Sequence, residues 1–391
     1  MNGQEKVDDS SPTPTSDIEK GVPSARRPLR DHPYGRGIGS AGGANAAVDE
    51  PANEVGSPSR SPSPSPPPSP PATKQTPYFE PRHPFLSTYS FLAFATIWGV
   101  LGRLGLEWIG GFAEREVFAV LWAQIVGCVV MGFVTERKKE VEAIFPPLFV
   151  MIGTGFCGSM TTWSSMANDT FVGFANLGQP VGTSRFAGFL SGVAITLVTL
   201  TVSMMALQFG VHLHDLLPRL PTIRTARPSR SLTTSFNLAT ILIGPVFLLG
   251  ALFLLIFGPH SWRVRATFAI VFGPFGTLVR YELSRHLNPL NSRFPIGTLS
   301  ANVGATLVFA AVGLAARRPT SPLTCAALKG LEDGFCASLS TISTFVVELR
   351  TLARRDSYRY FFATWALSEL ALVVVLGSWV WSGDRGDVCW T

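Results

Sequence analysis

A twelve-residue pattern occurs twice in the chain, and both copies lie inside apolar stretches long enough to cross a membrane. The first copy is GFCGSMTTWSSM, from Gly155 to Met166, and the second is GFCASLSTISTF, from Gly334 to Phe345. Small residues let backbones approach closely, and hydroxyl groups can donate hydrogen bonds to an anion or accept them from the backbone. Two such glycine-broken, hydroxyl-rich helices in lipid indicate a protein that moves something small and polar.

The composition separates a polar tail from an apolar region. The chain has 391 residues, of which 46% are hydrophobic and 15% are charged. Residues 1–85 include the run SPSRSPSPSPPPSPP and contain almost nothing apolar. Such a segment cannot bury enough apolar surface to offset the entropy lost on ordering. We therefore predict a disordered, Ser/Pro-rich cytosolic tail over 1–85.

Apolar runs of the length that spans a bilayer recur from residue 86 onward. Nine spans are predicted, approximately at 86–109, 116–135, 145–167, 184–210, 236–258, 264–286, 295–316, 323–348 and 358–381. Lys and Arg favour cytosolic loops, and the loop with Arg137, Lys138 and Lys139 outweighs the preceding one with Arg115. The bias predicts a cytosolic N-terminus and an extracellular C-terminus. It also accounts for the net charge of +6 without nucleic-acid binding, for which no aromatic-basic motif is present.

Internal matches extend the repeat beyond the twelve-residue pattern. The matched pairs are Gly99-x-x-Gly102 with Gly273-x-x-Gly276, Gln124 with Asn302, and Gly155 with Gly334, at offsets of 174, 178 and 179 residues. We therefore predict one four-helix repeat over 86–210, a linker transmembrane helix over 236–258 and a second four-helix repeat over 264–382. Because four spans return the chain to its starting side, the added linker inverts the second repeat relative to the first.

Three polar side chains inside the predicted spans are candidates for function. Asn302 lies in an apolar span, where an unpaired carboxamide costs several kcal/mol. Arg280 is either a snorkelling boundary charge or an attractor for anions; its counterpart at offset 174 is Leu106, and Arg103 is the nearest substitute. Glu369 is either a neutral carboxyl that bonds a neighbouring helix or the proton site of a carrier.

Other chemistries find little support in the sequence. The spans lack a nucleophile paired with His or Asp, so we do not expect an enzyme. The five cysteines have no metal-ligand spacing, and we expect all of them to be reduced.

These residues, in this order, resemble the fluoride channels of the CrcB/Fluc type, and specifically the fused two-domain fluoride export proteins (FEX) of eukaryotes. That pattern has an early helix with Gly-x-x-Gly followed by Arg, a second helix with Asn-Val, a broken third helix reading G-F-x-G-x-x-T-T-F-S-T-F, and a fourth helix with Ser. The resemblance covers about residues 86–382.

The resemblance implies a passive, fluoride-selective channel that exports fluoride across the plasma membrane, built as a monomeric pseudo-dimer. It implies a structural sodium ion held by main-chain carbonyls, which fall on Gly158, Thr161, Ala337 and Ser340. It also implies a pore that binds fluoride through neutral donors and aromatic ring edges. The residues expected to line it are Asn302, Arg280, Phe345, Ser343, Thr344, Ser368, Gln124, Trp163 and Ser164.

The chain departs from that pattern in its first half. Of the four positions expected to carry phenylalanine rings, only Phe345 does, and Gln124 replaces Asn. We therefore predict one working pore, built chiefly around Asn302, Arg280 and Phe345, and one degenerate pore. The sequence does not assign Trp163 to either pore. The alternative function is a proton-coupled small-anion carrier that depends on Glu369.

Overall fold

The computed structural model of the chain describes residues 77–111, 118–177, 184–217, 229–318, 320–383 and 388–390. All regular secondary structure in these ranges is helical, which confirms the all-α class predicted from the sequence. The predicted disordered tail falls outside the described residues up to residue 76.

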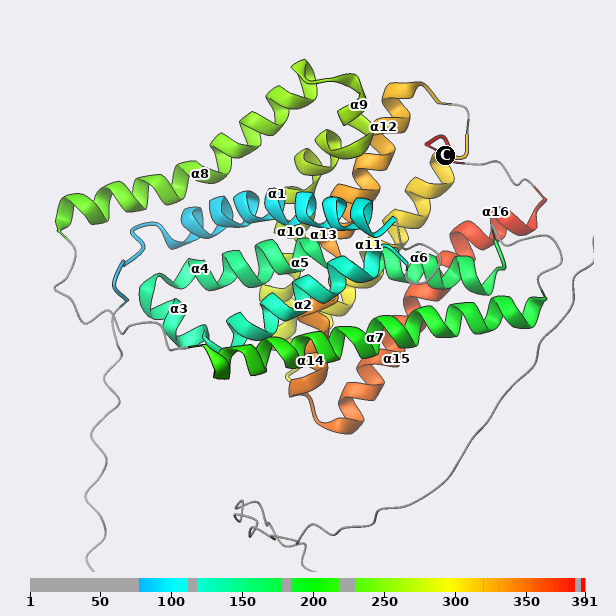
Figure 1. The fold of residues 1–391 in the computed structure, drawn as a ribbon, viewed down its shortest axis with the longest axis horizontal. Helices are drawn as coiled ribbons and strands as arrows, with labels where there is room; N and C mark the ends of the chain where they lie inside the picture. Colours follow the sequence, from blue (N-terminus) through cyan, green and yellow to red (C-terminus); the bar gives the residue numbers. More distant parts are fainter. Residues whose placement is uncertain are drawn as a thin grey trace, which may run out of the picture. The chain divides into compact units, whose positions relative to one another are not determined.

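Three long helices of the first half lie alongside one another, as Figure 1 shows. They are α1 (Pro84–Gly110), α2 (Val120–Glu136) and α7 (Arg185–Leu216). Between α2 and α7 the chain forms shorter pieces. These are α3 (Lys138–Ile144), α4 (Pro146–Val150), the π-helical turn η2 (Met151–Cys157), α5 (Gly158–Met160) and α6 (Trp163–Phe174).

The second half repeats this order of long and broken helices. It comprises η3 (Arg263–Thr267) and α10 (Phe268–Leu287), then α11 (Ile296–Ala315), then the broken series α12 (Pro322–Gly330), η5 (Leu331–Cys336), α13 (Ala337–Leu339) and α14 (Ser343–Thr351), and finally α15 (Arg354–Leu372), η6 (Val373–Gly377) and α16 (Ser378–Trp381). Two short helices, α9 (His260–Trp262) and η4 (Asn288–Leu290), lie at the corners before and after the stretch that contains α10.

The helix α8 (Arg230–Phe257) connects the two halves and packs on α1. The Gly244 N–H donates to Ser90 Oγ at 2.9 Å, and a Cβ at Gly244 would collide with the Ser90 backbone. The Ser87 and Thr240 hydroxyls lie 3.1 Å apart in the same interface. Hydroxyl contacts and the absence of a side chain at Gly244 therefore allow α8 to pack directly against α1.

Serine residues mark where three of the helices begin. Ser184, Ser229 and Ser321 precede α7, α8 and α12, and each side-chain oxygen accepts a backbone N–H of the first turn, at 3.2, 3.3 and 3.2 Å. An N-cap of this kind satisfies one of the donors that a helix start leaves free. In α12 the following Pro322 has no N–H to leave unpaired at that position.

Five helices in the described ranges are long and apolar enough to cross a membrane: Pro84–Gly110, Arg185–Leu216, Arg230–Phe257, Ile296–Ala315 and the continuous run Arg354–Trp381. The pair Val120–Glu136 and Lys138–Ile144, bent by 75°, adds a sixth if it is one span. Helices occupy the described parts of all nine predicted ranges, and the third and eighth are interrupted as expected. The count of nine crossings and the inversion of the halves stay predictions.

Two expectations from the sequence are corrected by the structure. Residues 77–85 belong to the ordered region, because Tyr78 and Phe79 donate backbone hydrogen bonds to the α3 end and Phe79 stacks on Phe236 at 4.1 Å between ring centroids. The cysteines are not all free, since Cys325 and Cys389 form a disulfide. Five cysteines without a spacing motif do not reveal which two approach each other in space.

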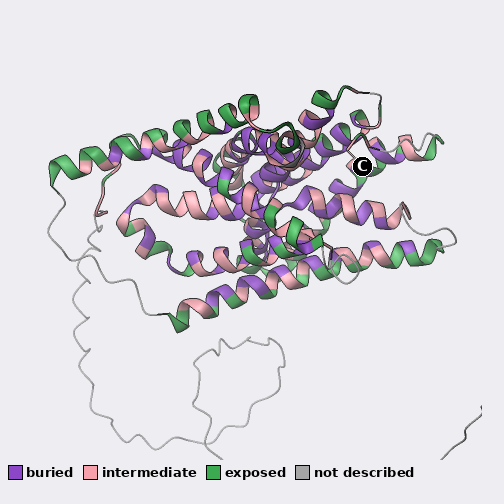
Figure 2. Ribbon diagram, turned by 45° about the horizontal axis from the view of Figure 1, so that its top comes forward, coloured by how far each residue is buried: buried purple, intermediate pink, exposed green. Residues whose placement is uncertain are grey.

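Buried positions concentrate where the helices of the two halves cross, whereas α7 and α8 show a largely exposed outer face in Figure 2. An apolar face without a protein partner is expected where a helix contacts lipid tails. The crossing region, in contrast, holds many of the buried serine and threonine side chains, including Thr161, Thr162, Ser340 and Thr341. The polar content of the fold is therefore gathered at its centre, around the two helix breaks.

Candidate functional site

The two breaks predicted from the repeated pattern lie against each other at the centre of the fold. Between α5 and α6, Thr161 and Thr162 are extended, with φ and ψ of −95° and 140° and of −135° and 128°. Between α13 and α14, Ser340 is extended, with φ −85° and ψ 163°. All three side chains are fully buried. Non-helical backbone at this depth needs partners inside the protein, because lipid supplies none.

Each break caps the helix that follows the other break. Thr161 Oγ1 accepts the backbone N–H groups of Ile342 and Ser343 at 3.3 and 3.0 Å, at the start of α14. Ser340 Oγ accepts the N–H groups of Trp163 and Ser164, both at 3.1 Å, at the start of α6. The two halves therefore complete each other's helix starts through equivalent hydroxyls that lie 179 residues apart.

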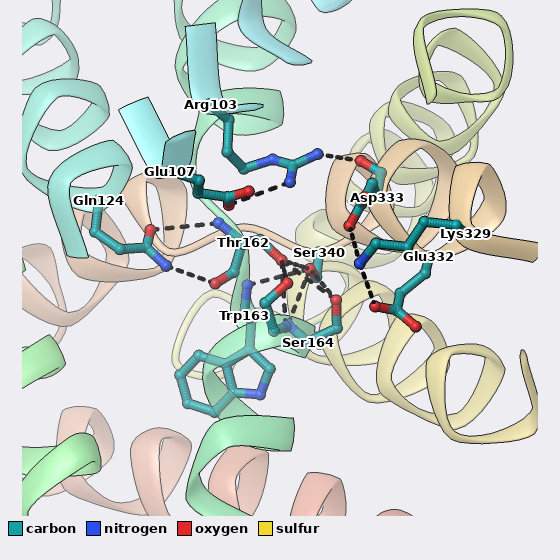
Figure 3. Close-up of polar contacts among 11 residues, drawn as sticks. Arg103, Glu107, Gln124, Thr162, Trp163, Ser164, Lys329, Glu332, Asp333 and Ser340 are labelled. Atoms are coloured by element: carbon teal, nitrogen blue, oxygen red, sulfur yellow. Dashed lines mark hydrogen bonds and ion pairs between the residues drawn. The ribbon is translucent and has the colours of Figure 1, made fainter. Parts of the chain in front are cut away.

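In each half, a side-chain amide on the second long helix (α2 or α11) forms two hydrogen bonds with the backbone of the adjoining break. Gln124 Nε2 donates to the Thr162 carbonyl at 2.7 Å, and Gln124 Oε1 accepts the Thr162 N–H at 3.3 Å, as Figure 3 shows. Asn302 makes the same pair of bonds to Thr341, at 3.2 and 2.8 Å. The partner that the buried Asn302 requires is thus backbone. Gln124, expected to mark the degenerate half, makes contacts equivalent to those of Asn302.

The arginines of the two halves are also equivalent, which corrects the predicted repeat register. Arg280 Nη2 donates to the Thr154 carbonyl at 2.7 Å, and Arg103 Nη2 donates to the Asp333 carbonyl. Thr154 and Asp333 are matched positions, 179 residues apart. The counterpart of Arg280 is therefore Arg103, 177 residues earlier, and the predicted pairing of Arg280 with Leu106 is wrong.

The helix crossings confirm this register. A Cβ at Gly99 would run into the Phe156 carbonyl, and a Cβ at Gly276 would run into the Phe335 carbonyl. Gly99 therefore matches Gly276, one turn away from the pairing with Gly273 that the sequence suggested. The error arose because glycines spaced by three residues can be slid by one turn without losing the pattern.

Arg280 is not a boundary charge that snorkels to the surface. Its residue exposure is 2%, and its guanidinium occupies the space that a side chain at Gly158 would fill. Among the described residues, Nε and Nη1 of Arg280 have no hydrogen-bond partner, and neither does Nε of Arg103. A buried cation with free donors is a group that an anion can pair with.

Aromatic rings gather on one side of the breaks. The ring centroids of Trp163 and Phe345 lie 4.6 Å apart, and those of Phe345 and Tyr360 lie 4.8 Å apart. The indole Nε1 of Trp163 donates to Ser368 Oγ at 2.9 Å. These residues come from α6, α14 and α15, so the structure joins Trp163, Phe345 and Ser368 in one cluster.

The matched positions of the other half do not form such a ring pair. The positions that match Trp163 and Phe345 are Ile342 and Met166, both buried. Hydroxyls are present there, since Thr199 and Ser203 on α7 are both buried. The two sides therefore differ in their aromatic groups more than in their hydroxyl groups.

The remaining predicted pore residues lie in or beside the breaks. Ser164 Oγ lies 3.0 Å from Ser340 Oγ, and Ser343 Oγ lies 3.0 Å from Thr161 Oγ1. Thr344 is half-buried on α14. Both serines thus belong to the central hydroxyl network that joins the two halves.

A half-buried carboxylate that the sequence reasoning did not single out, that of Glu348, lies beside the aromatic cluster. Glu348 Oε1 accepts the hydroxyl of Thr298 at 2.6 Å and the amide of Asn288 at 3.3 Å, and Oε2 accepts the Tyr360 hydroxyl at 2.8 Å. The network fixes the Tyr360 ring that contacts Phe345. The available signal was a lone acidic residue at the end of the eighth predicted span.

Charged side chains lie near Arg103, and three of them, Lys329, Glu332 and Asp333, lie on the far side of Thr162 and Ser340 from Gln124 in Figure 3. Lys329 Nζ pairs with Glu332 at 3.0 Å and Asp333 at 3.1 Å, while Arg103 pairs with Glu107 at 3.3 Å. Glu332 is 9% exposed, so its partner is needed to offset the cost of burying a charge. Glu369 on α15 is equally buried, but its Oε1 has no partner among the described residues.

Comparisons with known proteins identify the family. The description "CrcB-like protein, Camphor Resistance (CrcB)" matches residues 90–211 and 267–380. This chain belongs to the CrcB-like family. The two matched stretches agree with the two halves that the breaks, amides and arginines define.

Curated relatives extend the match to most of the chain. Fluoride export protein 1 of Neurospora crassa is 30% identical over 359 residues, which cover 78% of this chain and 68% of the relative. Fluoride export protein 1 of Candida albicans is 31% identical over 79% of this chain and 84% of the relative. A fluoride-specific ion channel FluC of Chromobacterium violaceum is 38% identical over 112 residues, only 27% of this chain but 86% of the relative. No solved structure matches the chain.

Proposed function

We propose that this protein is a passive, fluoride-selective channel that exports fluoride from the cytosol. The observation that carries the proposal is the pair of hydroxyl-rich breaks, capped across the halves, in a chain of the CrcB-like family. The relatives are named as fluoride exporters and a fluoride-specific ion channel, which also supports a protein that is not an enzyme. A bacterial relative is covered almost entirely by about a quarter of this chain, which supports a monomeric pseudo-dimer of two fused units.

The permeation path we propose runs along the aromatic side. A small, strongly hydrated anion needs close hydrogen-bond donors to replace its water, but a strong fixed charge in the pore would trap it. Ser368 offers a neutral hydroxyl, and the edges of Phe345 and Trp163 carry the positive part of the aromatic quadrupole. Arg280 lies outside this cluster, where a charge can attract the anion without holding it in the pore.

One working and one degenerate pore remain part of the proposal, but on revised grounds. The amides do not distinguish the halves, because Gln124 and Asn302 make equivalent contacts. The rings do, since Ile342 and Met166 replace Trp163 and Phe345 on the second side. Thr199 and Ser203 keep hydroxyls there, so the loss we infer is that of the aromatic contacts.

The break can also hold a structural sodium ion on the carbonyls of Gly158, Thr161, Ala337 and Ser340. This fit depends on backbone carbonyls that no longer accept a hydrogen bond from the next turn of their own helix. In a continuous helix the Thr162 N–H would donate to Gly158, and the Thr341 N–H to Ala337, but both donate to the side-chain amides. Carbonyl oxygens suit a hard monovalent cation, and the described residues offer no cluster of His, Cys, Asp or Glu for another metal. The ion would hold the two breaks together.

The proposed residence is the plasma membrane, with the N-terminus cytosolic and the C-terminus extracellular. The Cys325–Cys389 disulfide supports this orientation, because disulfides persist in oxidising compartments and are rare on the cytosolic side. Cys325 follows the loop that the charge bias assigns to the outside. An inside-negative membrane potential then drives fluoride outward without ATP hydrolysis.

The test is anion efflux from liposomes that contain the purified chain. We expect rapid efflux of fluoride but not chloride, driven by voltage alone. The unpartnered, buried Glu369 favours one rival, a proton-coupled small-anion carrier. Flux that requires an imposed pH gradient, and that is lost in Glu369→Gln, would establish the carrier and overturn the channel. Absence of fluoride flux would overturn both.

A further inference from the structure

The aromatic side contains one hydroxyl whose proton is not used within the protein. Ser368 is fully buried, and its oxygen accepts the Trp163 Nε1–H at 2.9 Å. An indole N–H can only donate, so the serine oxygen must be the acceptor in this bond. The Ser368 O–H group has no acceptor among the described residues. A buried donor without an acceptor costs free energy unless a ligand uses it.

Neighbouring threonines behave differently. On the same helix, Thr364 Oγ1 donates to the Tyr360 carbonyl at 2.8 Å, and on α11 Thr306 Oγ1 donates to the Asn302 carbonyl at 2.8 Å. Such back-bonding to the preceding turn is the usual arrangement for a hydroxyl in a membrane helix. Ser368 makes no such bond, and among the described residues its one hydrogen bond is the one that it accepts from Trp163.

We propose that Trp163 is a positioning residue for fluoride conduction: its indole N–H holds the Ser368 oxygen so that the Ser368 proton is presented to the anion. The indole bond also polarises the hydroxyl, and a hydroxyl that accepts one hydrogen bond donates a stronger one. The matching position in the other half, Ile342, has no donor, so this device belongs to one side only. The inference rests on the proposed function and adds a residue role to it.

The chain supplies a matched control in Trp365. Its Nε1 donates to the Thr196 hydroxyl at 3.3 Å, a second indole-to-hydroxyl bond. Thr196, however, can donate its proton to the Gly192 carbonyl at 3.1 Å. Trp365→Phe therefore removes the same type of bond without affecting a hydroxyl whose proton is free for an anion.

The experiment compares fluoride efflux from liposomes for wild type, Trp163→Phe, Trp365→Phe, Ser368→Ala and the double variant Trp163→Phe/Ser368→Ala. Phenylalanine keeps the ring and removes only the N–H group. We expect Trp163→Phe to lower the fluoride efflux rate about five- to tenfold, and Trp365→Phe to stay within about twofold of wild type. Because Trp163 acts through Ser368, the double variant should conduct no more slowly than Ser368→Ala alone.

The comparison of the double variant with the single variants distinguishes a positioning role of Trp163 from a general structural effect. The unfolding temperature of each variant is measured as well. Equal efflux from Trp163→Phe and wild type would overturn the inference and leave the proposed channel intact. Additive losses in the double variant, or an equal loss in Trp365→Phe, would overturn it as well. A wild-type protein without fluoride efflux would overturn both the inference and the function on which it rests.

Discussion

At the scale of single residues, Gln124 and Asn302 make equivalent hydrogen bonds, but we expect only Asn302 to be required for conduction as well as for stability. Gln124→Ala and Asn302→Ala each leave the backbone N–H and carbonyl of a buried break residue unpaired. We expect both variants to lose stability, by about 1–3 kcal/mol for each unsatisfied group. Only Asn302→Ala should also abolish fluoride efflux, because Asn302 lies on α11, which packs on both α6 and α15, the helices that carry Trp163 and Ser368. Thermal unfolding in detergent and liposome efflux test the two parts.

A Gln124→Ala protein that folds as stably as wild type would show that the amide contact is dispensable. A Gln124→Ala protein that conducts as poorly as Asn302→Ala would contradict the assignment of one working pore. The sequence predicted that Asn302 needs a buried partner, because an isolated amide in an apolar span is costly. It did not predict that the partner is the break itself, since that contact joins residues 39 positions apart.

At the scale of helices, the exchange of caps between the halves predicts that each break depends on the other. Thr161→Val keeps the shape of the side chain but removes the acceptor of two N–H groups at the start of α14. We expect a loss of about 1–2 kcal/mol, the range for removal of a helix N-cap. Thr201→Val is the control, because its exposed hydroxyl only bonds the preceding turn of α7. Equal unfolding temperatures for the two variants would contradict the exchange.

The sequence located both breaks but could not pair them. Glycine and hydroxyl residues at 155–166 and 334–345 predicted interrupted helices, and the structure confirms the interruptions. Local propensity gives no information about which hydroxyl caps which helix, because Thr161 and Ser340 each reach across about 180 residues. The glycine spacing was likewise compatible with two alignments of the repeats that differ by one helical turn. The equivalent hydrogen bonds of Arg103 and Arg280 decide between them.

At the scale of the whole molecule, residues 388–390 are linked to the second half by a disulfide and by non-covalent contacts. Besides the Cys325 disulfide, the Cys389 N–H donates to the Ala316 carbonyl at 2.9 Å, and the Trp390 ring lies 5.3 Å from Lys329 Nζ. Lys329 in turn pairs with Glu332 and Asp333. A cation held between an aromatic face and two carboxylates adds to this attachment. Residues 388–390 therefore lie on the same side of the molecule as the corner between α11 and α12.

This attachment makes the orientation of the protein measurable in intact cells. If the corner between α11 and α12 is extracellular, a reductant that cannot cross membranes should reduce the disulfide from outside. A membrane-impermeant maleimide should then label Cys389, which is exposed, and no cysteine before reduction, because Cys128, Cys157, Cys325 and Cys336 are all buried. Cys325→Ser should expose a single reactive thiol at Cys389 without reduction. Labelling that occurs only after the cells are permeabilised would reverse the proposed orientation.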